Sequence, residues 1–109
     1  MLELVATDDP AHPWLTGEIE DLCEAFASLR SVDEVERFLR DLCTLGELEA
    51  MAHRWQLAQL LDEGLPYQEV ARRTHASTTT VTRVAQWLRR GEGGYRLALD
   101  RLRRRSRSR

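Results

Sequence analysis

Hydrophobic residues in this chain recur at steps of three and four positions, the spacing of one face of an α-helix. Residues 1–13 lack this pattern and predict a loose N-terminal arm. An apolar stripe that starts at Trp14 predicts a first helix over about residues 16–29, and a second stripe predicts a helix over about 32–42. No segment shows the strict alternation typical of a half-buried strand.

Two pairs of polar residues mark helix starts. Ser31 with Glu34, and Thr44 with Glu47, have the spacing of a capping box, in which a hydroxyl and a carboxylate bind free backbone amides. The second pair opens a longer third helix, which we expect Gly64 to close as the residue just past its end. The apolar positions of this third helix are Leu45, Leu48, Met51, Ala52, Trp55, Ala58 and Leu61.

Three further helices are predicted in the C-terminal half, over about 66–74, over about 78–90, and across Tyr95 to Leu102 after a break rich in glycine. The chain is therefore expected to be all-α, with about six helices and one domain over 14–103. The arginine-rich residues 104–109 are expected to be a disordered tail.

Opposite charges gather at the two ends of the chain. Residues 1–50 carry 13 acidic residues and three arginines, a charge of −10, whereas residues 71–109 carry 12 arginines and two acidic residues, a charge of +10. This asymmetry suggests that the C-terminal part binds a polyanion.

The segment over residues 68–84 has the layout of a helix-turn-helix. Such a motif needs small residues where its helices cross, a tight turn, and a second helix with one apolar and one polar face. Ala71 and Ala76 supply the small residues, and Ser77 is suited to cap the second helix. His75 stands where the turn usually has glycine, so a positive φ there would strain a side-chain-bearing residue.

The helix over 78–90 predicts a DNA-reading surface. Val81, Val84 and Leu88 recur at helical spacing and are expected to face the core. The opposite face is rich in threonine, a mediocre helix former whose hydroxyl and methyl groups suit phosphates and base edges. We expect base contacts from Ser77, Thr78, Thr79, Thr82, Arg83 and Gln86, and phosphate contacts mainly from Arg72, Arg73 and Arg89 together with the arginine tail.

Several runs together resemble the Trp-repressor superfamily, and within it the TrpR-related YerC/YecD-type branch. The resemblance covers roughly residues 16–103 and rests on the runs Asp41 to Thr44, Ala58 to Gly64 and His75 to Val84, the break from Gly91 to Tyr95, and the last helix from Leu97 to Leu102. It implies an intertwined all-helical homodimer in which the N-terminal helices of one subunit wrap the other. It also implies that the helix over 78–90 enters the major groove of double-stranded DNA.

The same resemblance raises the question of a tryptophan corepressor, which in the Trp repressor lies between the third helix and the recognition helix. Thr44, Arg54 and Arg83 match polar positions of that pocket. Val84, however, replaces the glycine that follows the arginine, and a branched side chain would intrude on an indole. We therefore expect no cofactor and no tryptophan corepressor, and leave open another small effector.

Other function classes find less support in the sequence. The three histidines lack metal-ligand spacing, and no glycine-rich phosphate loop or paired catalytic carboxylates occur, so we expect neither an enzyme nor a metal site. No run is long and apolar enough for a membrane span, and no secretory signal is recognised, which favours the cytoplasm. Cys23 lies on an apolar helical face and is expected to be buried. The alternative to a DNA-binding regulator is a non-enzymatic interaction module whose basic C-terminal part docks an acidic protein or RNA.

Overall fold

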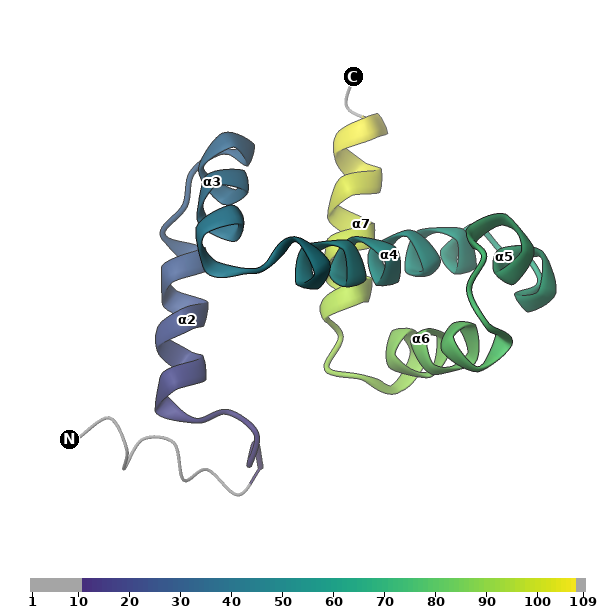
Figure 1. Cartoon of the computed structure of the whole chain (residues 1–109), viewed down its shortest axis with the longest axis horizontal. Coiled ribbons are helices and arrows are strands. Elements are labelled where there is room, and N and C mark those ends of the chain that lie inside the picture. The colour runs from purple at the N-terminus through teal and green to yellow at the C-terminus, as the bar shows by residue number, and fades with distance from the viewer. Residues whose placement is uncertain (1–10, 108–109) are drawn as a thin grey trace. The chain divides into compact units, whose positions relative to one another are not determined.

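The structure is a computed structural model that describes residues 11–107, and this stretch contains α-helices and no strands (Figure 1). The all-α prediction is confirmed. Contacts divide the chain into two compact units, Met1–Thr44 and Leu45–Arg109, and each is described by itself. The helices are α2 (Gly17–Ala27), α3 (Val32–Leu42), α4 (Leu45–Asp62), α5 (Tyr67–Thr74), α6 (Thr78–Arg90) and α7 (Gly94–Arg107).

Hydroxyl caps start both helices of the N-terminal unit. Thr16 Oγ1 accepts a hydrogen bond from the amide of Ile19 at 3.3 Å, and Ser31 Oγ accepts one from the amide of Glu34 at 3.1 Å. The Glu34 carboxylate accepts from the amide of Arg30 at 2.7 Å, one residue before the amide that a capping box would use. The predicted helix start at Ser31 is thus confirmed, with the carboxylate bond shifted by one residue.

The N-terminal unit has no buried hydrophobic side chain among its described residues. Phe26 of α2 and Phe38 of α3 meet edge to face, with ring centroids 5.1 Å apart, and both rings are only half-buried. Cys23 is exposed, so the expectation that it is buried is wrong for the single chain. Two short helices present too little surface to enclose a side chain between them.

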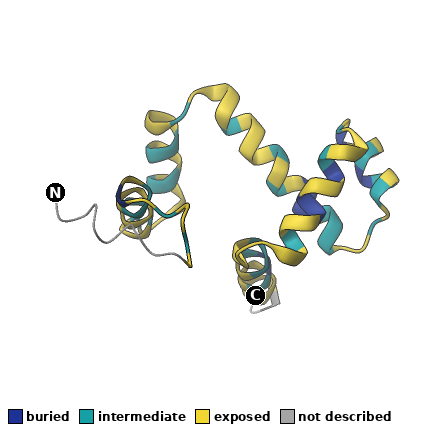
Figure 2. Cartoon of the chain, turned by 90° about the horizontal axis from the view of Figure 1, so that it is seen from below, coloured by how far each residue is buried: buried dark blue, intermediate teal, exposed yellow. Residues whose placement is uncertain are grey.

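A hydrophobic core lies in the C-terminal unit, where α4, α5 and α6 pack together (Figure 2). Leu57, Ala58, Val70 and Val81 are fully buried there, and Val84 is almost so. Burying each of the larger side chains contributes about 1.5–3 kcal/mol to folding. Trp55, expected in the core, packs against it partly buried and stacks on Tyr95 of α7 at 6.2 Å.

Only part of the apolar stripe predicted for the third helix is covered. Leu45 and Met51, near the start of α4, are exposed, whereas Leu57, which the predicted stripe omits, is fully buried. The core-packing residues of α4 begin at Trp55, so α5 and α6 cover only its C-terminal half. Position within the helix, rather than periodicity alone, decides which of its residues are buried.

Gly64 closes α4 as predicted. Its φ is +92°, its amide donates to the carbonyl of Leu61 at 3.0 Å, and the amide of Leu65 donates to the carbonyl of Leu60 at 3.4 Å. Such bonds satisfy helix-end carbonyls and need a left-handed residue, which glycine adopts without strain. Pro66 then caps α5, which places the next helix directly after the turn.

The C-terminal helix is longer than predicted. Residues 104–107 were expected in a disordered tail, but α7 continues to Arg107, and the last two residues of that tail lie outside the described range. No glycine or proline follows Gly94 in this segment, and arginine is a good helix former, so nothing ends the helix earlier. The predicted arm over 1–13 likewise falls mostly outside the described residues.

Ion pairs join α7 to the end of α4. Arg96 donates to Asp62 at 2.8 Å and to Asp100 at 2.9–3.0 Å, and Arg103 also pairs with Asp62. The hydrogen bonds that Arg96 donates to Asp62, then to Asp100, raise the pKa of Arg96. These bonds fix the start of α7 beside the core.

Candidate nucleic-acid interface

Helices α5 and α6 form a helix-turn-helix whose turn is built from short-range hydrogen bonds. The Thr74 hydroxyl donates to the carbonyl of Val70 at 2.7 Å and accepts from the amide of Ala76 at 3.4 Å. Thr74 is buried, and Ala76 packs against the core. The chain therefore leaves α5, turns over three residues and enters α6, with the buried Thr74 hydroxyl bonded to the backbone before and after it.

His75 occupies the left-handed region of backbone space in this turn, with φ 59° and ψ 22°. The positive φ that the sequence pattern raised as a possibility is thus found. A residue with a side chain is strained there, by an amount on the order of 1 kcal/mol, although histidine tolerates the region better than most.

The buried face of α6 matches the prediction. Val81 and Val84 are in the core and Ala85 is buried beside them, while Leu88 is partly buried. Since this face holds α6 against α4 and α5, the opposite face is fixed toward solvent. The core thus orients the recognition surface.

That solvent-facing side brings together five of the predicted base-contacting residues. All five are exposed, and they line a shallow surface hollow of about 320 Å³ formed by Thr78, Thr79, Thr82, Arg83 and Gln86. The hollow offers hydroxyls, an amide and a guanidinium within one patch of a single helix. These groups can donate to and accept from the edges of bases.

Ser77 has a structural role in this surface. Its Oγ accepts from the amide of Thr80 at 3.1 Å and lies 3.0 Å from the Thr80 hydroxyl, so it caps α6 as predicted. The hydroxyl is thereby partly engaged within the protein. Among the predicted base-contacting residues, Ser77 is the one that also caps a helix.

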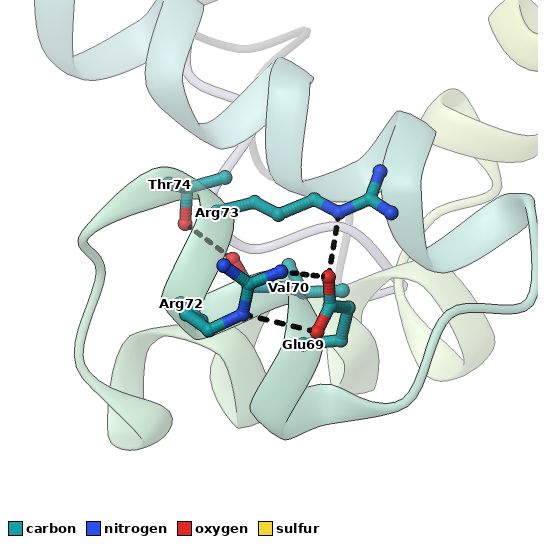
Figure 3. Close-up of polar contacts among 5 residues, drawn as sticks. All are labelled: Glu69, Val70, Arg72, Arg73 and Thr74. Atoms are coloured by element: carbon teal, nitrogen blue, oxygen red, sulfur yellow. Dashed lines mark hydrogen bonds and ion pairs between the residues drawn. The ribbon is translucent and has the colours of Figure 1, made fainter.

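Arg72 and Arg73, predicted to contact phosphates, both bind Glu69 on α5 (Figure 3). Arg72 grips the carboxylate with two nitrogens, Nε lying 3.2 Å from Oε1 and a terminal nitrogen contacting Oε2, while Arg73 Nε lies 2.8 Å from Oε2. Hydrogen bonds from Arg72, then Arg73, lower the pKa of Glu69 from 4.5 to about 2. The same pairing raises the pKa of Arg72.

Glu69 was not among the residues singled out from the sequence. Arg72 and Arg73 follow Glu69 by three and four positions, which places all three side chains on one face of a helix. This spacing could have predicted the ion pairs from the sequence. The guanidiniums remain largely open to solvent, with 71% of the Arg72 side chain and 53% of the Arg73 side chain exposed, against 30% for Glu69. We name this group the Glu69 cluster.

The remaining predicted residues belong to neither of these two groups. Arg89 is exposed at the end of α6, beside Leu61 and Leu88. Arg54 is exposed on α4 and Arg83 on α6, and Thr44 is an exposed residue of the other unit. An effector pocket that contains these three residues stays a prediction. Val84 is 1% exposed and is part of the core.

Between residues 11 and 107 no group of three or more histidine, cysteine, aspartate or glutamate side chains is placed to hold a metal ion. Over the same residues, no helix combines the length and apolar character needed to cross a bilayer.

The sequence of the chain is similar to those of known proteins. Residues 17–103 match the family model described as Trp repressor protein. The uncharacterized protein YerC of Bacillus subtilis is 39% identical over 85 residues, which span 78% of this chain and 82% of YerC.

Two solved structures are similar. A TrpR-like protein from Eubacterium eligens has a TM-score of 0.75 at 35% identity and covers 84% of this chain and 94% of its own. A candidate Trp repressor from Staphylococcus aureus has a TM-score of 0.76 at 28% identity and covers 88% and 96%. The resemblance drawn from the sequence is confirmed.

Proposed function

Because the chain belongs to the Trp repressor protein family, we propose that it is a sequence-specific DNA-binding transcriptional regulator, most simply a repressor. The observation that carries the proposal is the exposed face of α6, where threonines, Arg83 and Gln86 form one patch beside an intact helix-turn-helix turn. A surface that only needed to be stable and soluble would carry better helix formers than threonine.

The regulator is proposed to act as a homodimer on a pseudo-palindromic operator. Two copies of α6, related by a two-fold axis, would enter successive major grooves about 34 Å apart. Large apolar side chains left exposed in the single chain support this assembly, since a second copy can cover them. They include Leu22, Val32, Leu42, Leu45, Met51 and Leu102.

Within this proposal, choice of sequence and strength of binding come from different residues. Base contacts come from Thr78, Thr79, Thr82, Arg83 and Gln86, with Ser77 holding the helix start. Phosphate contacts come from Arg72, Arg73 and Arg89 and from the arginine-rich residues 104–109, which contribute affinity without regard to sequence. No tryptophan corepressor is proposed, because the branched residue Val84, which is buried here, replaces the glycine that follows the arginine in the Trp repressor.

The test is selection of duplexes by the purified full-length protein from random and genomic pools, at about 150 mM salt, with and without L-tryptophan. We expect enrichment of a two-fold-symmetric motif that does not depend on tryptophan. Arg83→Ala should then lose about 1–3 kcal/mol on that motif and much less on unrelated duplexes.

Arg83→Lys is the matched control, because it keeps the charge and loses the two-pronged guanidinium. Its affinity for unrelated duplexes should match that of the wild type, while its affinity for the enriched motif should still fall. Equal loss on all duplexes for Arg83→Ala would contradict base reading. Binding to acidic protein or RNA, without enrichment of any duplex, would favour the interaction module instead.

A further inference from the structure

The Glu69 cluster places a carboxylate on the two arginines proposed to bind DNA phosphates. Carboxylate and phosphate are both gripped by the guanidinium fork, so they can use the same donors. Arg72 gives Nε and a terminal nitrogen to Glu69, and Arg73 gives Nε. In the free protein, these donors already hold an anion.

We propose that Glu69 is an internal substitute for a DNA phosphate, which occupies Arg72 and Arg73 in the free protein and must be exchanged when the protein binds the DNA backbone. This inference rests on the proposed function. It assigns to Glu69 the role of a competitor that lowers affinity for duplexes of every sequence, while base contacts by α6 are untouched.

The geometry and the exposure of the cluster favour exchange of the Glu69 carboxylate for a DNA phosphate. The three side chains extend from one face of α5, with the arginines mostly in solvent and the carboxylate partly covered by them (Figure 3). Exposed ion pairs of this kind are weak enough for a competing anion to displace. The very low pKa of Glu69 keeps the carboxylate ionised, so it competes at any pH at which the protein is handled.

The net charge of the cluster shows how Glu69 reduces the affinity for DNA. One carboxylate and two guanidiniums leave a net charge of +1 facing the phosphates, and removing the carboxylate would make it +2. After exchange, the released Glu69 stays tethered near the DNA, where its charge opposes binding. Glu69 thus weakens the sequence-independent part of the affinity, the part that otherwise holds a protein on the wrong DNA.

The first measurement is the affinity of full-length Glu69→Gln for a random-sequence duplex across a range of salt concentrations. We expect about three- to tenfold tighter binding than wild type at low salt. The slope of log affinity against log salt should steepen by about 0.9 for each helix-turn-helix bound. Circular dichroism of both proteins verifies equal helical content.

Two controls separate exchange from other effects. Glu63→Gln removes the same charge from an exposed position at the end of α4, away from the cluster, and should change affinity and slope less. In an Arg72→Ala, Arg73→Ala background, Glu69→Gln should have a much smaller effect, because the arginines that Glu69 occupies are gone and only its repulsion of the DNA remains.

Each outcome decides the proposal. A gain that is clearly larger when both arginines are present supports it. An equal gain in both backgrounds means that Glu69 merely repels DNA, a loss means that it holds the arginines in place for binding, and no change means that it does neither; each of these overturns the inference while leaving the proposed function intact. If wild type binds no duplex at any salt concentration, the proposed function fails and the inference with it.

Discussion

Both units of this chain contain amphipathic helices, but the two units differ in how far these helices bury their hydrophobic side chains. In the C-terminal unit, α4, α5 and α6 meet at an angle that encloses Leu57, Val70 and Val81 completely. In the N-terminal unit, α2 and α3 share an aromatic contact but bury no hydrophobic side chain among their described residues. Amphipathic pattern alone therefore does not make a core; a third element that closes over the apolar faces does.

The units also differ in charge, and the difference follows the same division. The acidic excess lies in the first 50 residues and the basic excess after residue 70, where the helix-turn-helix and α7 lie. The unit that can hold its own shape is thus the one that carries the proposed DNA surface. A recognition helix needs such support, because its side chains must be held in place to read bases.

The largest effect that would test this contrast is on stability. Leu57→Ala should lower the free energy of unfolding by about 2–5 kcal/mol, since it leaves a cavity among fully buried neighbours. Val32→Ala, at a side chain 68% exposed in α3, should change it by less than about 0.5 kcal/mol. Urea unfolding in dilute protein measures both. A loss at Val32 as large as that at Leu57 would show that Val32 is buried in solution, either within the chain or against a second copy.

Hydrogen exchange would show how the apolar faces of the N-terminal unit are covered. We expect the amides of α2 and α3 to exchange faster than those of α6 in dilute protein, because fewer buried contacts protect them. Their protection should rise with protein concentration if a second copy covers them, while that of α6 rises less. Protection of α2 and α3 that is independent of concentration would contradict the proposed homodimer.

A helix cap offers a smaller and more local test. Ser31→Ala removes the hydroxyl that accepts from the amide of Glu34, which should cost about 1 kcal/mol of stability. The loss appears in the main unfolding transition only if α3 unfolds together with the C-terminal unit. Ser31→Asp, which restores an acceptor, is the control and should retain most of the stability. Thermal unfolding followed by circular dichroism at 222 nm distinguishes these cases.

The smallest expected effect concerns pH and the Glu69 cluster. The pKa of Glu69 is lowered from 4.5 to about 2 by its arginine partners, so its pairing stabilises the fold above about pH 4.5. That contribution is lost as the pH falls from 4.5 toward 2, because the folded protein must then take up a proton at a group that resists it. The stability difference between wild type and Glu69→Gln should shrink over this window, in acid titrations followed by circular dichroism. A constant difference would show that the pairing is not the cause.

Local features of this protein are set by its sequence alone. The bounds of α3 and α6, the caps at Ser31 and Ser77, the closing turn at Gly64 and the left-handed backbone at His75 all follow from residues within a few positions of one another. Hydrogen bonds that close over three or four residues depend little on the rest of the chain. The all-α class follows from the same periodicity.

Tertiary packing decided the features that depend on distant residues. Leu57 is buried and Met51 exposed because α5 and α6 cover only one end of α4, and Cys23 is exposed in a unit that buries no hydrophobic side chain among its described residues. Glu69 could be placed near Arg72 and Arg73 by helical spacing, but its grip on both depends on side-chain conformations that spacing does not specify. Burial depends on which surfaces pack together, and the hydrophobic pattern along one helix does not specify its packing partners.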